Sequence, residues 1–175
     1  MAVTATNGRI GPAVVLKSGT DIGGTMGSVD VTLRVTDTPL KFDQLGTEPA
    51  DLARVGFGAN AVLPRAEITM PAWGDILVGE TTVTSGTKKR ISCTGVIGQM
   101  AQRDSLWSKY IVKPMKAGVA DTDANEWITF PRGFGTPNTT LSFTVDGQRV
   151  VPVTVEGLPD TGASNVRVIF GDETA

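Results

Sequence analysis

The sequence predicts an all-β, mainly antiparallel protein, built as a two-sheet β-sandwich or barrel with one short flanking α-helix and long loops. Three observations predict this class. The 175 residues include 21 Gly and 10 Pro, so turn residues divide the chain into short segments. Apolar and polar residues alternate from Val29 to Thr36. Asp146-Gly147, whose residues accept the positive φ of a type I′ turn, separates two β-rich runs.

The clearest strand is the run from Val29 to Thr36. Its period of two places Val29, Val31, Leu33 and Val35 on one face of the strand. A second alternating run extends over 62–70 and contains Pro64, which has no N–H to donate to a sheet. We therefore expect 62–70 to form an edge strand or a bulged strand.

The other strand candidates are short and bounded by Gly, Pro or Asp, a spacing that suits a sandwich or barrel. They are residues 12–16, 81–84, 89–97, 110–115, 127–131, 141–145, 150–155 and 166–170. We expect the short helix over 98–108, where Met100, Ala101 and Trp107 make an apolar stripe, and a weaker helix candidate over 71–78. Long loops are expected over 17–28 and 36–51.

Composition limits both organisation and partners. We expect residues 1–175 to form a single domain. The net charge is −2, so the chain lacks the basic surface that a general electrostatic grip on nucleic acid requires. A single cysteine, Cys93, excludes an intrachain disulfide framework. We find no signal-peptide pattern and no apolar stretch of about 18 residues, and so expect a soluble protein made in the cytoplasm, without a membrane anchor.

The sequence contains no histidine, which removes the usual general base and the commonest metal ligand. We therefore expect a protein that is not an enzyme, with no catalytic, cofactor-binding or metal-binding residues and no cofactor. The segment Asp121 to Glu126 has oxygen ligands at alternate positions but lacks the glycine and the final acidic residue of a calcium loop, where Arg132 falls instead. We interpret it as a solvated turn before a strand at Trp127.

Four other features have both a structural and a functional interpretation, and we favour the structural one for each. The glycines of segment 19–25 lack the Lys-Ser or Lys-Thr of a P-loop, which favours a flexible loop. The basic run 88–90 is typical of a solvated strand end, or otherwise of a contact with an acidic neighbour. Cys93 is interpreted as a small buried residue, and Trp73, Trp107 and Trp127 as core or interface anchors.

The succession of these elements resembles the major tail proteins, or tail tube proteins, of long-tailed bacteriophages. The resemblance covers most of the chain from Val29 onward. The segments that carry it are 29–44, 61–70, 110–115, 127–134 and the closing hairpin through 152–160.

The resemblance implies a structural virion protein of the phage tail. It implies hexameric rings that stack into a hollow tube, with the inner sheets of six subunits joined into one barrel around the DNA channel. The partners implied are further copies of the chain and other tail proteins, with DNA only as non-specific cargo. Ring closure would pair the exposed strand edges, and we expect the long loops, 71–88 included, to bridge stacked rings and to become ordered on assembly.

Two alternatives stay open. Another virion β-sandwich, such as a head decoration or tail-tip protein, would share the strand content without polymerising. A carbohydrate-binding β module, or a lyase, is suggested by the three tryptophans, although they share no strand register.

Overall fold

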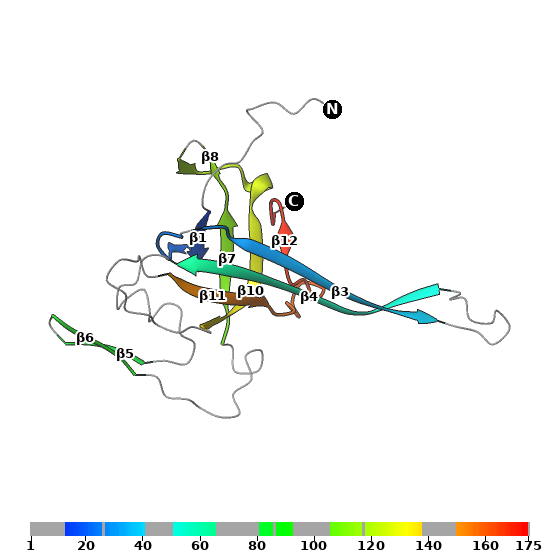
Figure 1. Cartoon of the computed structure of the whole chain (residues 1–175), viewed down its shortest axis with the longest axis horizontal. Coiled ribbons are helices and arrows are strands. Elements are labelled where there is room, and N and C mark those ends of the chain that lie inside the picture. The colour runs from blue at the N-terminus through cyan, green and yellow to red at the C-terminus, as the bar shows by residue number, and fades with distance from the viewer. Residues whose placement is uncertain are drawn as a thin grey trace.

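The computed structural model describes residues 13–25, 27–40, 51–65, 81–85, 87–92, 106–116, 118–137 and 150–174. Strands dominate this part of the chain (Figure 1). They are β1 (Val14–Lys17), β2 (Thr20–Asp21), β3 (Asp30–Leu40), β4 (Asp51–Arg65), β5 (Thr81–Ser85), β6 (Lys88–Ser92), β7 (Ser108–Lys113), β8 (Met115–Lys116), β9 (Val119–Ala120), β10 (Ile128–Pro137), β11 (Val151–Gly157) and β12 (Ile169–Phe170). The mainly antiparallel all-β class is confirmed.

One eight-stranded sheet forms the body, in the order β2-β1-β7-β10-β11-β4-β3, with β12 also paired to β10. The strands β5 and β6 form a separate two-stranded sheet, and so do β8 and β9. Every strand pair is antiparallel. The sandwich predicted from the sequence is therefore made by one continuous sheet.

The sheet folds over itself at β10. The first part of β10 pairs with β7 and its second part with β11, and the register shifts between Phe130 and Gly133. In Figure 1, β7 and β10 run across β11, β4 and β3, so the two halves pack as crossed layers. Gly133 is needed at this turn because a Cβ there would meet the Tyr110 ring and lie 2.8 Å from Val155 Cγ1.

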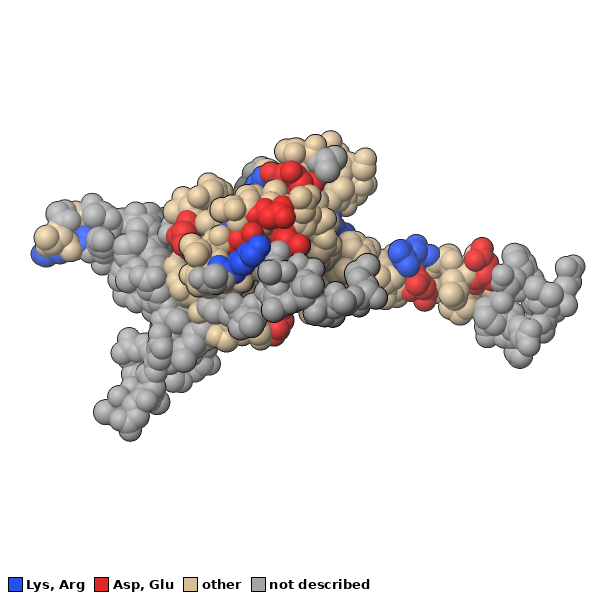
Figure 2. Space-filling model, turned by 90° about the horizontal axis from the view of Figure 1, so that it is seen from above, with Lys and Arg blue, Asp and Glu red and all other residues tan. Residues whose placement is uncertain are grey.

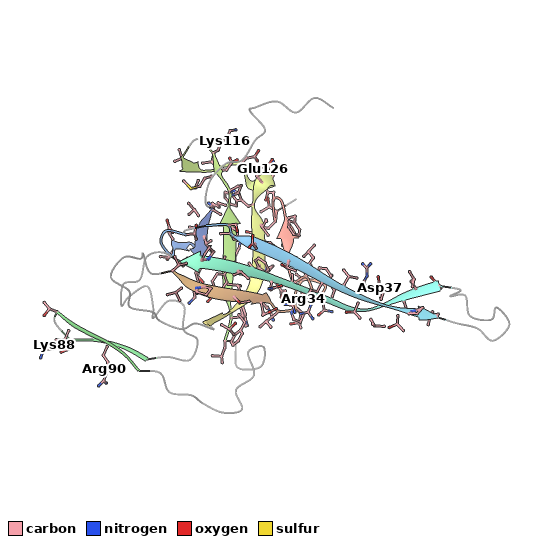
Figure 3. All side chains as sticks on the ribbon, in the orientation of Figure 1. Arg34, Asp37, Lys88, Arg90, Lys116 and Glu126 are labelled. Atoms are coloured by element: carbon pink, nitrogen blue, oxygen red, sulfur yellow. The ribbon has the colours of Figure 1, made fainter. Side chains whose placement is uncertain are left out.

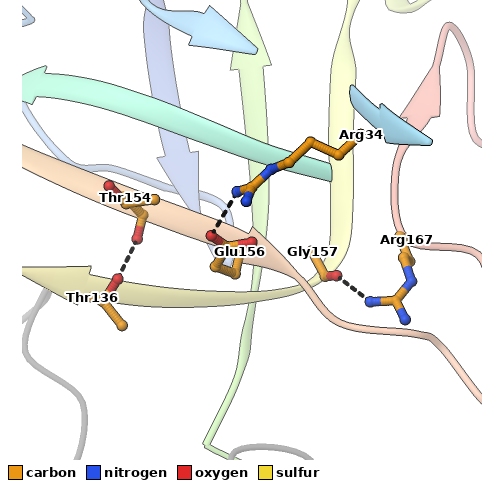
Figure 4. Close-up of polar contacts among 6 residues, drawn as sticks. All are labelled: Arg34, Thr136, Thr154, Glu156, Gly157 and Arg167. Carbon is orange, nitrogen blue, oxygen red and sulfur yellow. Dashed lines mark hydrogen bonds and ion pairs between the residues drawn. The ribbon is translucent and has the colours of Figure 1, made fainter. Parts of the chain in front are cut away.

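The core fills the space between these layers. It consists of Val15, Ile22, Ala59, Ala61, Leu63, Tyr110, Val112, Phe130, Val153 and Val155. Along β11, buried Val151, Val153 and Val155 alternate with Pro152 and Thr154, so the strand predicted for 150–155 is confirmed and has one face in the core. Side-chain bonds to the backbone link neighbouring segments (Figure 4). Thr136 Oγ1 donates to the Thr154 carbonyl, and Arg167 donates to the Gly157 carbonyl.

The bulge predicted at Pro64 is wrong, and the predicted edge is present only locally, at the end of β4. β4 is an inner strand between β3 and β11, and its register with β11 continues through Pro64 without a shift. Pro64 fits because β3 begins at Asp30 opposite Val62, so no described strand pairs with Pro64 on that side. On the other side Pro64 lies opposite Pro152, which also has no N–H, so this pair needs no ladder bond.

The two predicted long loops also need correction. Within 17–28, Lys17 pairs with Thr20, and Ser18 and Gly19 have φ of 50° and 84°, so β1 and β2 form a two-residue hairpin. Within 36–51, strand β3 continues to Leu40 and β4 begins at Asp51. Residues 41–50 lie outside the described part of the chain.

The expected helix is only partly covered by the structure. Residues 98–105 and 71–78 lie outside the described residues, whereas Leu106 and Trp107 are not helical and Ser108 begins β7. The described residues contain a 3₁₀ turn at Ala124–Glu126 and no α-helix, hence none long and apolar enough to cross a membrane. The segments 66–70 and 141–145 and the Asp146-Gly147 turn also lie outside the described residues.

Candidate assembly surface

The strands β3 and β4 continue well beyond the body as a two-stranded arm (Figure 1). They pair from Asp30 opposite Val62 to Leu40 opposite Asp51. Near the body this ribbon belongs to the core, because Ala59 and Ala61 are buried and Val31 packs against them. Farther out, no other described strand pairs with either member of the ribbon.

The face of the arm that continues the core is apolar. Residues directly opposite each other in an antiparallel pair share a face, so Leu33 joins Ala59, and Val35 joins Phe57. In this exposed part, Leu33 is 47%, Val35 46% and Phe57 39% exposed. The face that is buried in the body is therefore exposed to solvent on the arm.

A bulge and an ion pair lie next on this ribbon. Thr36 is opposite Gly56 and Asp37 opposite Arg54, which leaves Val55 as the extra residue of a β-bulge. Arg54 Nε lies 3.1 Å from Asp37 Oδ1. Because β3 has no extra residue, Asp37 and Pro39 continue the face of Val35, and Leu52, 64% exposed, lies opposite Pro39. The apolar face thus resumes beyond the ion pair.

The opposite face of the arm is polar at its base. Arg34 reaches across β4 to Glu156 of β11, with 3.3 Å between Arg34 Nη2 and Glu156 Oε1 (Figure 4). Both side chains are largely exposed, so the pair adds little stability on its own. In Figure 2 basic and acidic side chains lie side by side on the arm, and further acidic ones lie nearer its end. The register places no charged residue between the Leu33–Ala59 and Val35–Phe57 pairs.

The outer edge of β3 is a second uncovered feature. β3 is the terminal strand of the main sheet and is 11 residues long. Its backbone groups on the side away from β4 have no partner strand in the described part of the chain. A long open edge of this kind pairs readily with a strand of another chain. The arm therefore has both an exposed apolar face and an unpaired strand edge.

The predicted turn at Asp121 to Glu126 has the structure expected of a turn, although Asp121 is buried instead of solvated. Asp121 Oδ1 accepts a hydrogen bond from the Asp123 N–H, and Asp123 caps the 3₁₀ turn by accepting from the Asn125 N–H. Among the described residues, no three His, Cys, Asp or Glu side chains are grouped as metal ligands.

The glycine-bearing segment 19–25 is held by its own side chains. Gly23 N–H donates to Asp21 Oδ1, and Thr25 Oγ1 donates to the Ala13 carbonyl. Ile22 is buried in the core. Part of the segment predicted as a loop is therefore strand β2, and Ile22 places one of its side chains in the core.

Two of the tryptophans stack against cations. Lys113 Nζ lies 3.7 Å from the centre of the Trp127 ring, whose Nε1 donates to the Asp121 carbonyl. The Arg132 guanidinium lies 4.7 Å from the Trp107 ring and also pairs with Asp160 at 2.9 Å. Neither Trp107, which is 36% exposed, nor Trp127 belongs to the core, so the interpretation of these two rings as core residues is wrong, and their role as interface anchors stays a prediction. Trp73 and Cys93 lie outside the described residues.

The structure brings together residues that the sequence did not connect. Leu33 and Val35 were predicted to share one face of a strand, whereas Phe57 and Leu52 were not singled out at all. The signal for them is present, because apolar residues recur through Val55 and Phe57 opposite the alternating run of β3. No protein-family model matches the chain, and no curated protein matches its sequence.

Proposed function

We propose that this chain is the structural subunit of a phage tail tube, which associates with copies of itself into rings that stack into a hollow conduit for DNA. The observation that carries the proposal is the arm, in which Leu33, Val35 and Phe57 extend the core face out of the body and into solvent. The ring number of six comes from the family resemblance alone.

Self-association follows from the cost of leaving such a surface in water. Exposed apolar faces and long open strand edges promote contacts with other chains. Both features lie on the same arm, so one partner that contacts the arm covers the apolar face and can extend the sheet beyond β3. A second copy of the chain supplies both a matching apolar face and a matching edge.

Charge is compatible with a conduit. The chain has 16 basic and 18 acidic residues, so a wall built from it does not bind phosphates along its length. The wall of such a tube must not bind the DNA that passes through it. The near balance of charge therefore supports a role in passage over a role in DNA binding.

Electron microscopy of the purified chain in negative stain tests this function. We expect rings or long hollow tubes as the protein concentration is raised. Persistent monomers or trimers under all conditions would contradict the proposal and favour a non-polymerising virion protein, such as a head decoration or tail-tip component. If substitutions in the arm abolish the tubes while the free chain stays folded, assembly depends on this surface.

A further inference from the structure

The β5–β6 hairpin is a second projecting element, and it stands apart from the main sheet. Its strands pair with each other from Thr81 opposite Ser92 to Ser85 opposite Lys88. No other described strand belongs to this sheet. A two-stranded hairpin alone is at best marginally stable in water, so a partner that covers one face would stabilise it.

The hairpin carries only positive charge among its described residues. Lys88, Lys89 and Arg90 follow one another on β6, and residues 81–85 and 87–92 include no Asp or Glu. The register places Lys88 and Arg90 on one face. Lys88 and Arg90 are exposed (Figure 3), and neither forms an ion pair with any described residue.

The outer part of the β3–β4 arm has the complementary character. Its described residues there, 37–40 and 51–54, carry two carboxylates, Asp37 and Asp51, and one cation, Arg54. Arg54 is already paired with Asp37. Asp51 is exposed opposite Leu40, which is itself 44% exposed, so a carboxylate and an apolar side chain share one face near the end of the described arm.

The two projections leave the body on opposite sides. In Figure 1 the hairpin and the arm point away from each other, and in Figure 2 basic side chains lie at the end where the hairpin is found. They cannot meet within one chain in this arrangement. Contact between them requires two copies in a head-to-tail order, which closes into a ring or continues as a filament.

We propose that the β5–β6 hairpin of one copy docks against the outer β3–β4 arm of the next copy, with Lys88 and Arg90 facing Asp51 beside Leu40. The proposal rests on the proposed self-assembly and adds which surfaces meet. The contact is heterologous, since each copy gives its hairpin to one neighbour and its arm to the other. Rim charges of this kind act mainly on partner choice and association rate.

Charge exchange between two variants of the full chain tests the contact. The hairpin variant is Lys88→Glu/Arg90→Glu, and the arm variant is Thr38→Lys/Asp51→Lys, which places two lysines on one face of the arm. We expect each variant alone to need about tenfold more protein than wild type to assemble at low salt. An equimolar mixture restores assembly, because every hairpin then meets an arm of opposite charge. This recovery also shows that both variants fold.

The change Lys116→Glu on β8 is the control for reversing the charge of an exposed lysine outside the hairpin, since Lys116 is exposed and lies on a different strand pair (Figure 3), and it should assemble as wild type does. Assembly of the hairpin variant at the wild-type concentration overturns the contact while leaving the tube function intact. The contact is also overturned if the hairpin variant assembles normally but no longer binds a labelled DNA duplex. That result would mean that the hairpin binds nucleic acid. Wild-type protein that stays monomeric contradicts the tube function and the contact together.

Discussion

Val35 of β3 lies directly opposite Phe57 of β4, and both side chains are exposed although their face is the one that becomes buried at Ala61 and Leu63. The face stays apolar along the strand, but at Val35 and Phe57 no other layer of the structure packs on it. This pair therefore marks where the chain's own core ends and where, in our proposal, the surface for another copy begins.

Replacing this pair should separate assembly from folding. For Val35→Asp/Phe57→Asp we expect loss of rings and tubes, because charges would have to be buried between copies. The free chain should lose only about 1 kcal/mol of unfolding free energy, since exposed cross-strand pairs contribute little. Sedimentation velocity and urea unfolding measure the two effects. Thr36→Asp, on the opposite face of β3, should assemble normally; equal loss of assembly there would contradict the assignment of the face.

Gly133 should be intolerant of any side chain. A Cβ at this position meets the Tyr110 ring and Val155, so Gly133→Ala should lower the unfolding free energy by about 1–3 kcal/mol. Denaturant unfolding followed by tryptophan fluorescence measures the change. Gly24→Ala is the control, because a Cβ there has nothing within 4 Å, and it should stay within about 0.5 kcal/mol of wild type. Equal effects would show that the fold of β10 does not depend on this contact.

Phe130 should be the most sensitive of the aromatic side chains. It is fully buried between the two halves of the sheet, so Phe130→Ala should cost about 3–5 kcal/mol. Phe170, which is 56% exposed on β12, provides the same chemical change without the same burial. Phe170→Ala is expected to change the thermal unfolding midpoint by only a few degrees. If Phe170→Ala lowered the thermal unfolding midpoint more than Phe130→Ala did, the assignment of the core would be wrong.

Asp172 should titrate below its ordinary range. Hydrogen bonds from the Thr174 N–H and then from the Thr174 hydroxyl hold the pKa of this carboxyl below its usual 3.8. The sign of the effect is a small stabilisation at neutral pH, which is lost as the pH falls through the lowered pKa. NMR titration of the side-chain carboxyl carbon measures it. Thr174→Val removes only the hydroxyl and should raise the midpoint part of the way; no movement would leave the backbone bond as the sole cause.

Much of the sheet was predictable from local pattern. The alternation at Val153 and Val155 predicts a face, and the burial of that face follows once β10 and β4 lie on either side of β11. The hairpin at Ser18-Gly19 was missed because its partner strand, β2, has only two residues and no alternation to detect. The prediction at Pro64 failed because a proline restricts only the side of a strand on which its N–H would donate, and β3 begins opposite Val62 and so does not lie beside Pro64.

The candidate surface was less predictable for a physical reason. Alternation says which side chains share a face, but the presence of a covering layer depends on contacts distant in sequence. Leu33 and Val31 have the same pattern and chemistry, yet Val31 packs against the core and Leu33 is 47% exposed. Strand length was underestimated for the same reason, because Thr36 to Leu40 is extended only by its pairing with β4.

Hydrogen exchange of the β3 amides, compared between the free subunit and the assembled form, tests the central claim most directly. The account predicts strong additional protection on assembly across Asp30–Leu40, because the open edge and the apolar face of the arm become covered together. Amides of β7, which lies inside the body, serve as the internal reference and should change little. Assembled particles in which the β3 amides exchange as fast as in the free chain would contradict the account.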